Sequence, residues 1–303
     1  MIRKLVNEGV LRHEWPLRLY LKLTGSGAKI KAGQYRFPSP ITPLAVLRKL
    51  EEGEERLSHL TIIEGWTRWD IAASLMRVPE LQLPDMNAAL ALMDEVGGIR
   101  DLDPQAKNLE GYLFPATYTF TPGTKAPAVI AAMVKRFRQE WTPARAESAR
   151  ALNMTPRQIV TIASLIETEA KLKEERPLVA SVIYNRLKRG MPLAIDATVI
   201  YASKLAGQWK EDGKVYQSDI DRRSPYNTRL VAGLPPGPIA SPGASSLEAA
   251  LNPATTDYLY YVRDPARDDG AHNFYSNGGE FQKGVEALRK WERSRDAQAG
   301  GQN

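Results

Sequence analysis

The sequence contains no cysteine, which excludes a disulfide framework, a thiolate nucleophile and a metal site built on cysteine. Its three histidines, His13, His59 and His272, lie far apart, and no HExxH or other paired-histidine spacing occurs. A GxSxG turn and a GxxxxGKS/T loop are also absent, so serine-hydrolase and P-loop chemistry lose support. We therefore expect no metal ion and no cofactor, and carboxylates remain as the side chains for catalysis.

Long apolar runs are missing as well. No segment approaches the roughly 18 consecutive apolar residues of a membrane-spanning helix, and the first residues carry no signal-peptide core. The chain as given is predicted to be soluble. It begins inside an expected helix, residues 2–9, so we expect an upstream segment to be missing from this sequence.

The formal charge is +6, which suits an anionic polymer such as nucleic acid, an acidic membrane surface or a wall glycan with peptide carboxylates. Such a charge is equally common in proteins that bind none of these. Charges of both signs are spread along the expected helices and do not cluster with aromatic residues. We therefore expect no nucleic-acid partner.

The first hundred residues mix short helices and strands, which indicates an α+β fold. Residues 17–23 alternate leucine with other residues and fit a strand by period or a basic helix by composition. Residues 33–37 suggest a short strand. A helix is expected from Thr42, its N-cap, to near Gly53.

A strand expected at residues 60–65 ends in a glycine turn, and a helix follows from Thr67. This order resembles the opening of a LysM-like glycan-binding module, although many small α+β units share it. We expect an N-terminal region with this module at residues 1–107 and a larger mixed α+β domain, which we take as catalytic, at residues 108–290. The polar tail, residues 291–303, is predicted to be disordered.

The helix after Asn153 is the best-specified element. Thr155 and Gln158 have capping-box spacing. One apolar stripe at about 100° per residue contains Ile159, Ile162, Ala163, Ile166 and Ala170. Glu167 and Glu169 lie at opposite edges of this stripe.

A carboxyl group held against apolar surface resists ionisation, which is the condition for a general acid that later acts as a base. The alternative is that both glutamates are partly exposed or form ion pairs with Lys171, Lys173 or Arg176. Helix geometry alone does not choose between Glu167 and Glu169.

Several segments, spread over roughly residues 33–290, follow one another as in a known family. They are Leu109–Pro115, Ala163–Glu169, Val182–Leu187, Gly190–Leu193, Asp196–Tyr201, Ser224–Thr228, Gly233–Ile239, Ser241–Ala244, Asn252–Ala254 and Tyr258–Val262. Together they resemble the endolytic murein transglycosylase (MltG/YceG-like) family. The resemblance implies that Glu167, after the apolar pair, is the catalytic acid/base.

The resemblance implies a lytic transglycosylase that cleaves the MurNAc–GlcNAc β-1,4 bond of nascent peptidoglycan strands. One glutamate then serves twice, because the C6 hydroxyl of the sugar closes a 1,6-anhydro ring and no water is consumed. Such cleavage terminates or trims the strands. The family also implies an N-terminal membrane anchor, absent here, a place at the outer face of the cytoplasmic membrane, and cell-wall synthases as partners.

The chain departs from the family pattern at Ala116, Ala197 and Asn273. Ala197 stands where the family usually has proline, which leaves the conformation of the neighbouring loop open. None of these positions is the proposed catalytic residue.

Polar residues in the matching segments can hydrogen-bond sugar hydroxyls and acetamides. We expect substrate contacts from Glu110, Asn185, Asp196, Thr198, Tyr226, Asn227 and Thr228. The alternatives are surface exposure for Asn185, a turn after Pro225 for Tyr226 and Asn227, and a positioning role or an ion pair for Glu110.

Two other functions compete with this one. A hydrolytic muramidase would pair Glu167 with Asp196 or Glu169 and add water to its product. A non-catalytic wall-binding protein would use the LysM-like part and would not need Glu167.

Overall fold

The computed structural model describes residues 1–24, 30–31, 35, 37, 40–53, 57–121, 123–210 and 212–300. The chain divides into two compact units, Met1–His59 with Thr119–Thr124, and Leu60–Tyr118 with the chain from Lys125 onward. This division does not coincide with the boundary expected near residue 107. Residues 60–107 belong to the larger unit because the helices in them pack against the helix that follows Lys125.

The first unit is a small helical cluster with α1 (Ile2–Asn7), α2 (Trp15–Thr24) and α3 (Pro43–Glu52). The leucine alternation at residues 17–23 is therefore helical. Thr42 caps α3 by accepting a hydrogen bond from the backbone of Ala45, as expected. The strand expected at residues 33–37 includes residues outside the described part of the chain. The core consists of Leu5, Leu11, Leu17, Val46, Leu47 and Leu50.

Strands β1 (Ser58–Thr61) and β2 (Thr117–Phe120) form a two-stranded sheet. After β1 come α4 (Arg68–Met76), η2 (Pro79–Leu81), α5 (Met86–Leu92) and η3 (Val96–Ile99). The strand, turn and helix expected from residue 60 are present, with Thr67 as the cap of α4. A LysM-like module remains a prediction.

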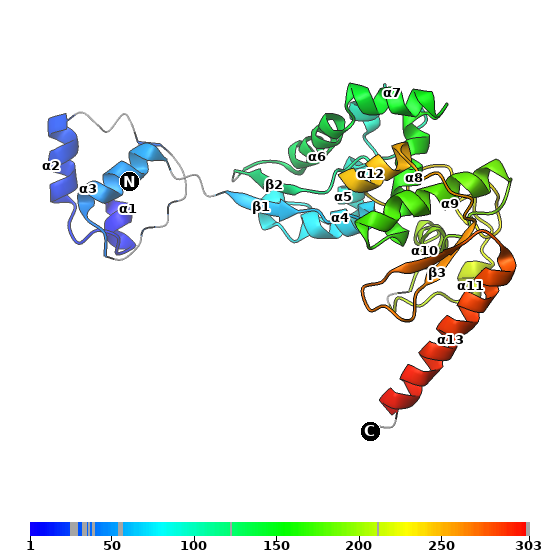
Figure 1. Cartoon of the computed structure of the whole chain (residues 1–303). Coiled ribbons are helices and arrows are strands. Elements are labelled where there is room, and N and C mark those ends of the chain that lie inside the picture. Colours follow the sequence, from blue (N-terminus) through cyan, green and yellow to red (C-terminus); the bar gives the residue numbers. More distant parts are fainter. Residues whose placement is uncertain are drawn as a thin grey trace. The chain divides into compact units, whose positions relative to one another are not determined.

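Helices dominate the middle of the second unit (Figure 1). They are α6 (Ala126–Glu140), α7 (Pro143–Ala151), α8 (Pro156–Glu169), η4 (Lys173–Glu175), α9 (Arg176–Lys188), α10 (Asp196–Leu205), α11 (Gln217–Ile220) and α12 (Ala244–Leu251). The capping box at the start of α8 is confirmed. Residues 159–166 of α8 are all buried, and α9, α10, α12 and α7 pack around this helix.

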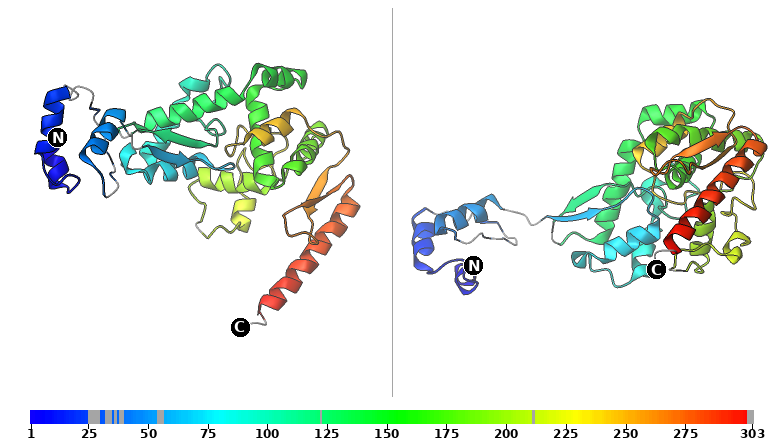
Figure 2. Two further views of the ribbon diagram at one scale, coloured as in Figure 1. Left: turned by 60° about the vertical axis from the view of Figure 1, so that its left-hand side comes forward. Right: turned by 60° about the horizontal axis from the view of Figure 1, so that its bottom comes forward.

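The chain ends in a β-hairpin and a long helix. Strands β3 (Tyr260–Arg263) and β4 (His272–Tyr275) are antiparallel, and α13 (Gly278–Gly300) packs on both (Figure 2). The helix includes residues 291–300, for which we expected disorder; charged and alanine residues there favour helix. With these helices and two small sheets, the α+β prediction is confirmed. Within the described ranges, no helix combines the length and apolar character needed to cross a membrane.

Candidate active site

Helix α8 ends with two glutamates that face different surroundings. Residues two positions apart on an α-helix differ by about 200° in direction. The side chains of Glu167 and Glu169 therefore leave α8 on nearly opposite sides.

Glu167 is held in a buried ion pair. Its Oε1 lies 2.8 Å from Nη2 of Arg176 and its Oε2 accepts hydrogen bonds from Arg176 Nη1 at 3.2 Å and from the Gly243 backbone at 2.8 Å. The Glu167 and Arg176 side chains are only 4% and 6% exposed. Arg176 also donates to Ser245 and lies 3.8 Å from Glu64.

The apolar setting expected for Glu167 is therefore incomplete. Arg176 is the first residue of α9, and the short η4 turn brings its guanidinium back to the end of α8. Three hydrogen-bond donors hold this carboxyl group, so the alternative of an ion pair with Arg176 describes Glu167.

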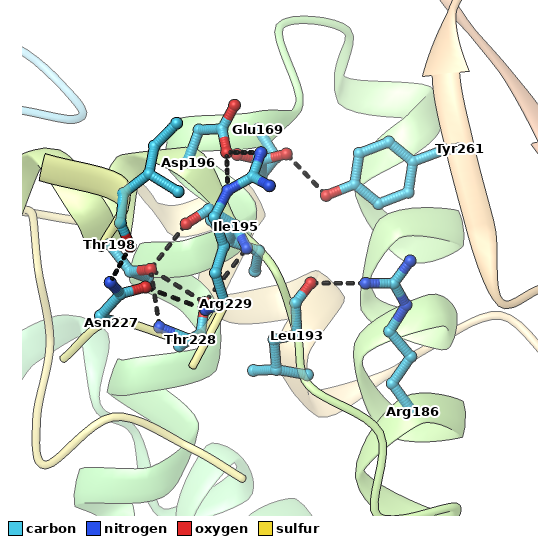
Figure 3. A network of polar contacts seen from close by, with 11 residues as sticks. Glu169, Arg186, Leu193, Ile195, Asp196, Thr198, Asn227, Thr228, Arg229 and Tyr261 are labelled. Carbon is cyan, nitrogen blue, oxygen red and sulfur yellow. Dashed lines mark hydrogen bonds and ion pairs between the residues drawn. The ribbon is translucent and has the colours of Figure 1, made fainter. Parts of the chain in front are cut away.

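Glu169 faces a cleft of about 530 Å³. The cleft is lined by Glu169, Arg186, Met191, Pro192, Leu193, Ala194, Asp196, Arg229, Tyr260, Tyr261 and Phe281. These residues come from α8, α9, α10, β3, α13 and the loops beside α10. Figure 3 shows Glu169 and Tyr261 pointing toward one another, with Asp196 and Arg229 beside them.

The surroundings of Glu169 favour its neutral form. Loss of solvation by burial raises its pKa, and the nearby charge of Asp196 raises it further. The hydrogen bond from Tyr261, with Oη 2.6 Å from Oε2, and the charges of His272 and Arg186 act in the opposite direction and do not outweigh the burial. The side chain keeps some exposed surface at the cleft, yet burial remains the largest influence. Glu169 thus combines a raised pKa with a position in the cleft wall that a ligand can reach.

Asp196 lies on the rim of the same cleft in an ion pair. Its Oδ1 accepts hydrogen bonds from Arg229 Nε at 2.8 Å and Nη2 at 2.5 Å. Asp196 and Arg229 are 63% and 39% exposed, so both remain open to a ligand. The structure therefore places Asp196 with Glu169, as an acidic group already paired with a cation.

Thr198, Asn227 and Thr228 are fully or almost fully buried and form hydrogen bonds within the protein. The hydroxyls of Thr198 and Thr228 are 2.8 Å apart, and Thr228 also accepts from the Ile195 backbone at 3.1 Å. Asn227 donates to the carbonyls of Ile220 and Arg222 at 2.8 Å and 2.9 Å. These three residues fix the start of α10, which carries Asp196, and the loop that carries Arg229. Their side chains are not among those that line the cleft.

Asn185 also has a partner within the fold. From α9 it donates to the carbonyls of Thr256 and Tyr258, both at 2.9 Å, and so holds the segment before β3. Its side chain is absent from the cleft lining. The expected substrate contact for Asn185 remains a prediction, and the geometry favours a structural role.

Glu110 and Tyr226 both line a second cleft, of about 240 Å³, which shares no lining residue with the first. Glu110 is 3% exposed, and the backbone N–H of Arg68 is shared between its two carboxyl oxygens, at 3.2 Å from Oε1 and 3.1 Å from Oε2. Burial raises the pKa of Glu110 to about 7. The expected site residues are thus distributed between two clefts and the protein interior.

Tyr261, Arg186 and Arg229 were not selected from the sequence, although all three line the larger cleft. Tyr261 lies in the matching segment Tyr258–Val262, and Arg186 lies in Val182–Leu187. Their place in segments that match the family is the one feature of the sequence that points to Tyr261 and Arg186. The match does not indicate which side chains of a segment face Glu169.

Known proteins match most of this chain. A model of the YceG-like family matches residues 1–287. An endolytic murein transglycosylase from Bacillus subtilis (strain 168) is 36% identical over 290 residues, which cover 91% of this chain and 78% of that protein. An endolytic murein transglycosylase from Streptococcus pneumoniae (strain D39) is 31% identical over 84% of this chain, which spans 50% of that protein's length. A crystal structure of a YceG-like protein from Listeria monocytogenes is 31% identical, with a TM-score of 0.67 and 93% of each chain covered.

Proposed function

The chain belongs to the YceG-like family, and from that premise we propose that it is an endolytic murein transglycosylase acting on the glycan strands of peptidoglycan. Relatives with that name share 31–36% identity with it over most of its length. The observation that carries the catalytic part of the proposal is the cleft of about 530 Å³ with Glu169 in its wall.

Glu169 is proposed as the acid/base. It combines access to the cleft with a raised pKa, and the neutral hydroxyl of Tyr261 donates a hydrogen bond to it. Glu167 is the alternative indicated by the motif resemblance. Its carboxyl is bound by Arg176 and by the Gly243 backbone, and it does not line either cleft. A general acid needs a proton and contact with the leaving oxygen, and the raised pKa of Glu169 and its place in the cleft wall support this role.

The proposed reaction cleaves the β-1,4 bond between MurNAc and GlcNAc. Glu169 gives its proton to the glycosidic oxygen as the bond from that oxygen to the MurNAc C1 breaks. The C6 hydroxyl of the same MurNAc then forms a bond to C1, and its proton passes to the Glu169 carboxylate. The product has a 1,6-anhydro end, and Glu169 is again protonated.

A hydrolytic muramidase is the second candidate function, because Asp196 and Glu169 line one cleft. Such an enzyme needs a free carboxylate as nucleophile or as a base for water. Asp196 accepts two hydrogen bonds from Arg229, so it is less suited to act as a nucleophile or as a base for water. A transglycosylase needs only one acid/base. A cleft that holds Glu169 and an ion-paired Asp196 therefore suits a transglycosylase better than a muramidase.

Three finer parts of the proposal rest on the family resemblance. The enzyme acts at the outer face of the cytoplasmic membrane, it is held there by an N-terminal anchor outside this sequence, and it works beside cell-wall synthases. A LysM-like role for the N-terminal region belongs with them. Fractionation and crosslinking of the full-length protein in cells test the placement and the partners.

The catalytic proposal is tested by incubating purified sacculi with the protein and with the variants Glu169→Gln and Glu167→Gln. Released fragments are identified by mass spectrometry. We expect 1,6-anhydro ends from the parent chain and a loss of rate on the order of 10²-fold or more in Glu169→Gln. Glu167→Gln should retain cleavage, measured per folded molecule.

Full activity in Glu169→Gln together with loss in Glu167→Gln would transfer the role to Glu167. Fragments heavier by one water would support the muramidase. Binding to sacculi without cleavage by any of the three proteins would support a wall-binding function instead.

A further inference from the structure

Tyr261 reaches Glu169 from the hairpin that follows the catalytic helices in the sequence. Its hydroxyl donates a hydrogen bond of 2.6 Å to Oε2 of Glu169, within the usual range for an O–H···O bond. Within the described part of the chain, no other hydrogen bond to the Glu169 carboxyl is formed. Burial, the charge of Glu169 and this hydrogen bond raise the pKa of Tyr261 well above its ordinary value, so the hydroxyl keeps its proton.

Tyr261 is itself held from the neighbouring strand. The ring of His272 on β4 meets the ring of Tyr261 edge to face, with centroids 5.4 Å apart and planes at 83°. Both oxygens of Glu175 bind His272, with Oε1 2.8 Å from the backbone nitrogen and Oε2 2.8 Å from Nδ1. Glu175 and His272 are largely buried, at 9% and 15% side-chain exposure. A row of contacts therefore runs from Glu175 through His272 and Tyr261 to Glu169.

We propose that Tyr261 is a positioning residue, which binds Oε2 of Glu169 and leaves Oε1 to exchange the proton with the substrate. Glu175 and His272 hold the ring of Tyr261 in place for this purpose. The inference rests on the proposed role of Glu169.

The reason lies in the two oxygens of a carboxyl group. A protonated carboxyl has one donor oxygen and one carbonyl oxygen, and an incoming hydrogen bond from Tyr261 stabilises the form in which Oε2 is the acceptor. The proton then resides on Oε1. Without the tyrosine hydroxyl, both oxygens can carry the proton and the carboxyl group can rotate. Fixing one atom toward the substrate is the kind of orientation that accelerates proton transfer.

Other charged groups face Glu169 and must be considered in any pH measurement. Asp196 on α10 favours the neutral form, while Arg186 on α9 and His272 on β4 favour the charged form. The hydroxyl of Tyr261 also favours the charged form. Its removal should therefore move the loss of activity at high pH to a higher pH, because Glu169 then holds its proton longer.

The test is Tyr261→Phe, which keeps the ring and removes only the hydroxyl. We expect the cleavage rate at the optimum to fall on the order of tenfold through lost orientation. We also expect the descending limb of the pH–rate profile to shift to higher pH. A matched control is Tyr184→Phe, because the Tyr184 hydroxyl on α9 donates to the Ala250 carbonyl on α12 at 2.8 Å and Tyr184 does not line the cleft. The descending limb of the pH–rate profile of Tyr184→Phe should stay at the pH of the parent chain.

A second variant tests the row of contacts. Glu175→Gln should lower the rate in the same direction as Tyr261→Phe, and the double variant should be no slower than Tyr261→Phe alone, because Glu175 acts through Tyr261. Thermal unfolding of each variant reports whether the fold is intact. If the rate losses of Glu175→Gln and Tyr261→Phe multiply in the double variant, Glu175 does not act through Tyr261.

The outcomes separate this inference from the proposed function. If Glu169→Gln abolishes cleavage while Tyr261→Phe changes neither the cleavage rate nor the descending limb of the pH–rate profile, only the positioning role of Tyr261 fails. A slower Tyr261→Phe enzyme with an unshifted limb also overturns it, since a merely structural tyrosine gives that result. If Glu169→Gln remains fully active, the proposed function itself fails.

Discussion

Glu167 and Glu169 stand two residues apart at the end of α8, and one has a cation as its nearest partner while the other has a phenol. Arg176 Nη2 lies 2.8 Å from Glu167 Oε1, and the Tyr261 hydroxyl lies 2.6 Å from Glu169 Oε2. Burial beside a neutral donor raises the pKa of Glu169. The end of one helix therefore presents an ion-paired carboxyl group and a phenol-bonded carboxyl group to different sides.

The pH dependence of cleavage should follow Glu169. Its pKa is raised, mainly by burial, so the protonated acid persists above the pH near 4–5 at which an ordinary glutamate ionises. We expect the rate to persist above that pH and to fall as the pH rises through the raised pKa. Initial rates of fragment release from sacculi across pH 4–10 check this. A rate that already falls at pH 4–5 would contradict it.

Glu167→Gln should destabilise the protein, because it leaves Arg176 buried with one of its partners uncharged. Breaking a buried ion pair in this way typically costs about 3–5 kcal/mol. Urea unfolding measures the loss, and Glu169→Gln is the matched control because it changes the same residue type on the same helix turn. Equal stability of the two variants would show that the pair with Arg176 contributes nothing.

The local signals in the sequence were sufficient for the elements around the site. Thr155 and Gln158 predicted the start of α8, and Thr67 predicted the start of α4. These features depend on neighbours a few residues away, so a single sequence contains them.

The composition of the cleft depends on contacts between distant segments. Tyr261 lies 92 residues from Glu169, and Arg229 lies 33 residues from Asp196. Asn227 and Thr228 have the right chemistry for sugar contacts, yet they form hydrogen bonds within the interior. A sequence shows which groups can form hydrogen bonds and not in which direction they point.

The stability of the protein should decrease as the pH rises through the titration of Glu110. The pKa of Glu110 is about 7 in the fold against 4.5 for an ordinary glutamate, so the folded chain holds this proton more strongly than the unfolded chain. Its contribution to stability is fully present below about pH 4.5 and is lost by about pH 7, on the order of 3 kcal/mol.

Unfolding free energies at pH 5 and pH 8 test this for the parent chain and for Glu110→Gln. The variant should lose less stability over that interval. Glu147→Gln is a control, since the Glu147 side chain is 72% exposed. If Glu110→Gln and Glu147→Gln show the same change with pH, the buried titration is absent.

Gly111→Ala should be strongly destabilising. Gly111 has φ +81°, and an added Cβ would lie 2.4 Å from Cβ of Pro238, whose ring cannot turn aside. Backbone strain and overlap together should cost about 3 kcal/mol or more. Gly190→Ala is the control, with φ +64° and open space around the added atom, and should cost about 1–2 kcal/mol. Thermal and urea unfolding measure both, and equal losses would contradict the overlap with Pro238.

Asp196→Asn distinguishes the two reaction types in the larger cleft. The ion pair with Arg229 is exposed, so its loss should change stability by less than about 1 kcal/mol. In a transglycosylase, Glu169 needs no second carboxylate, and the variant should keep cleavage within about tenfold of the parent while still producing 1,6-anhydro ends. Asp196 also raises the pKa of Glu169 by its charge, so the descending limb of the pH–rate profile should move to lower pH. A muramidase that uses Asp196 to attack the sugar or to activate water would instead lose on the order of 10²–10⁴-fold in rate, with no need for any shift of that limb.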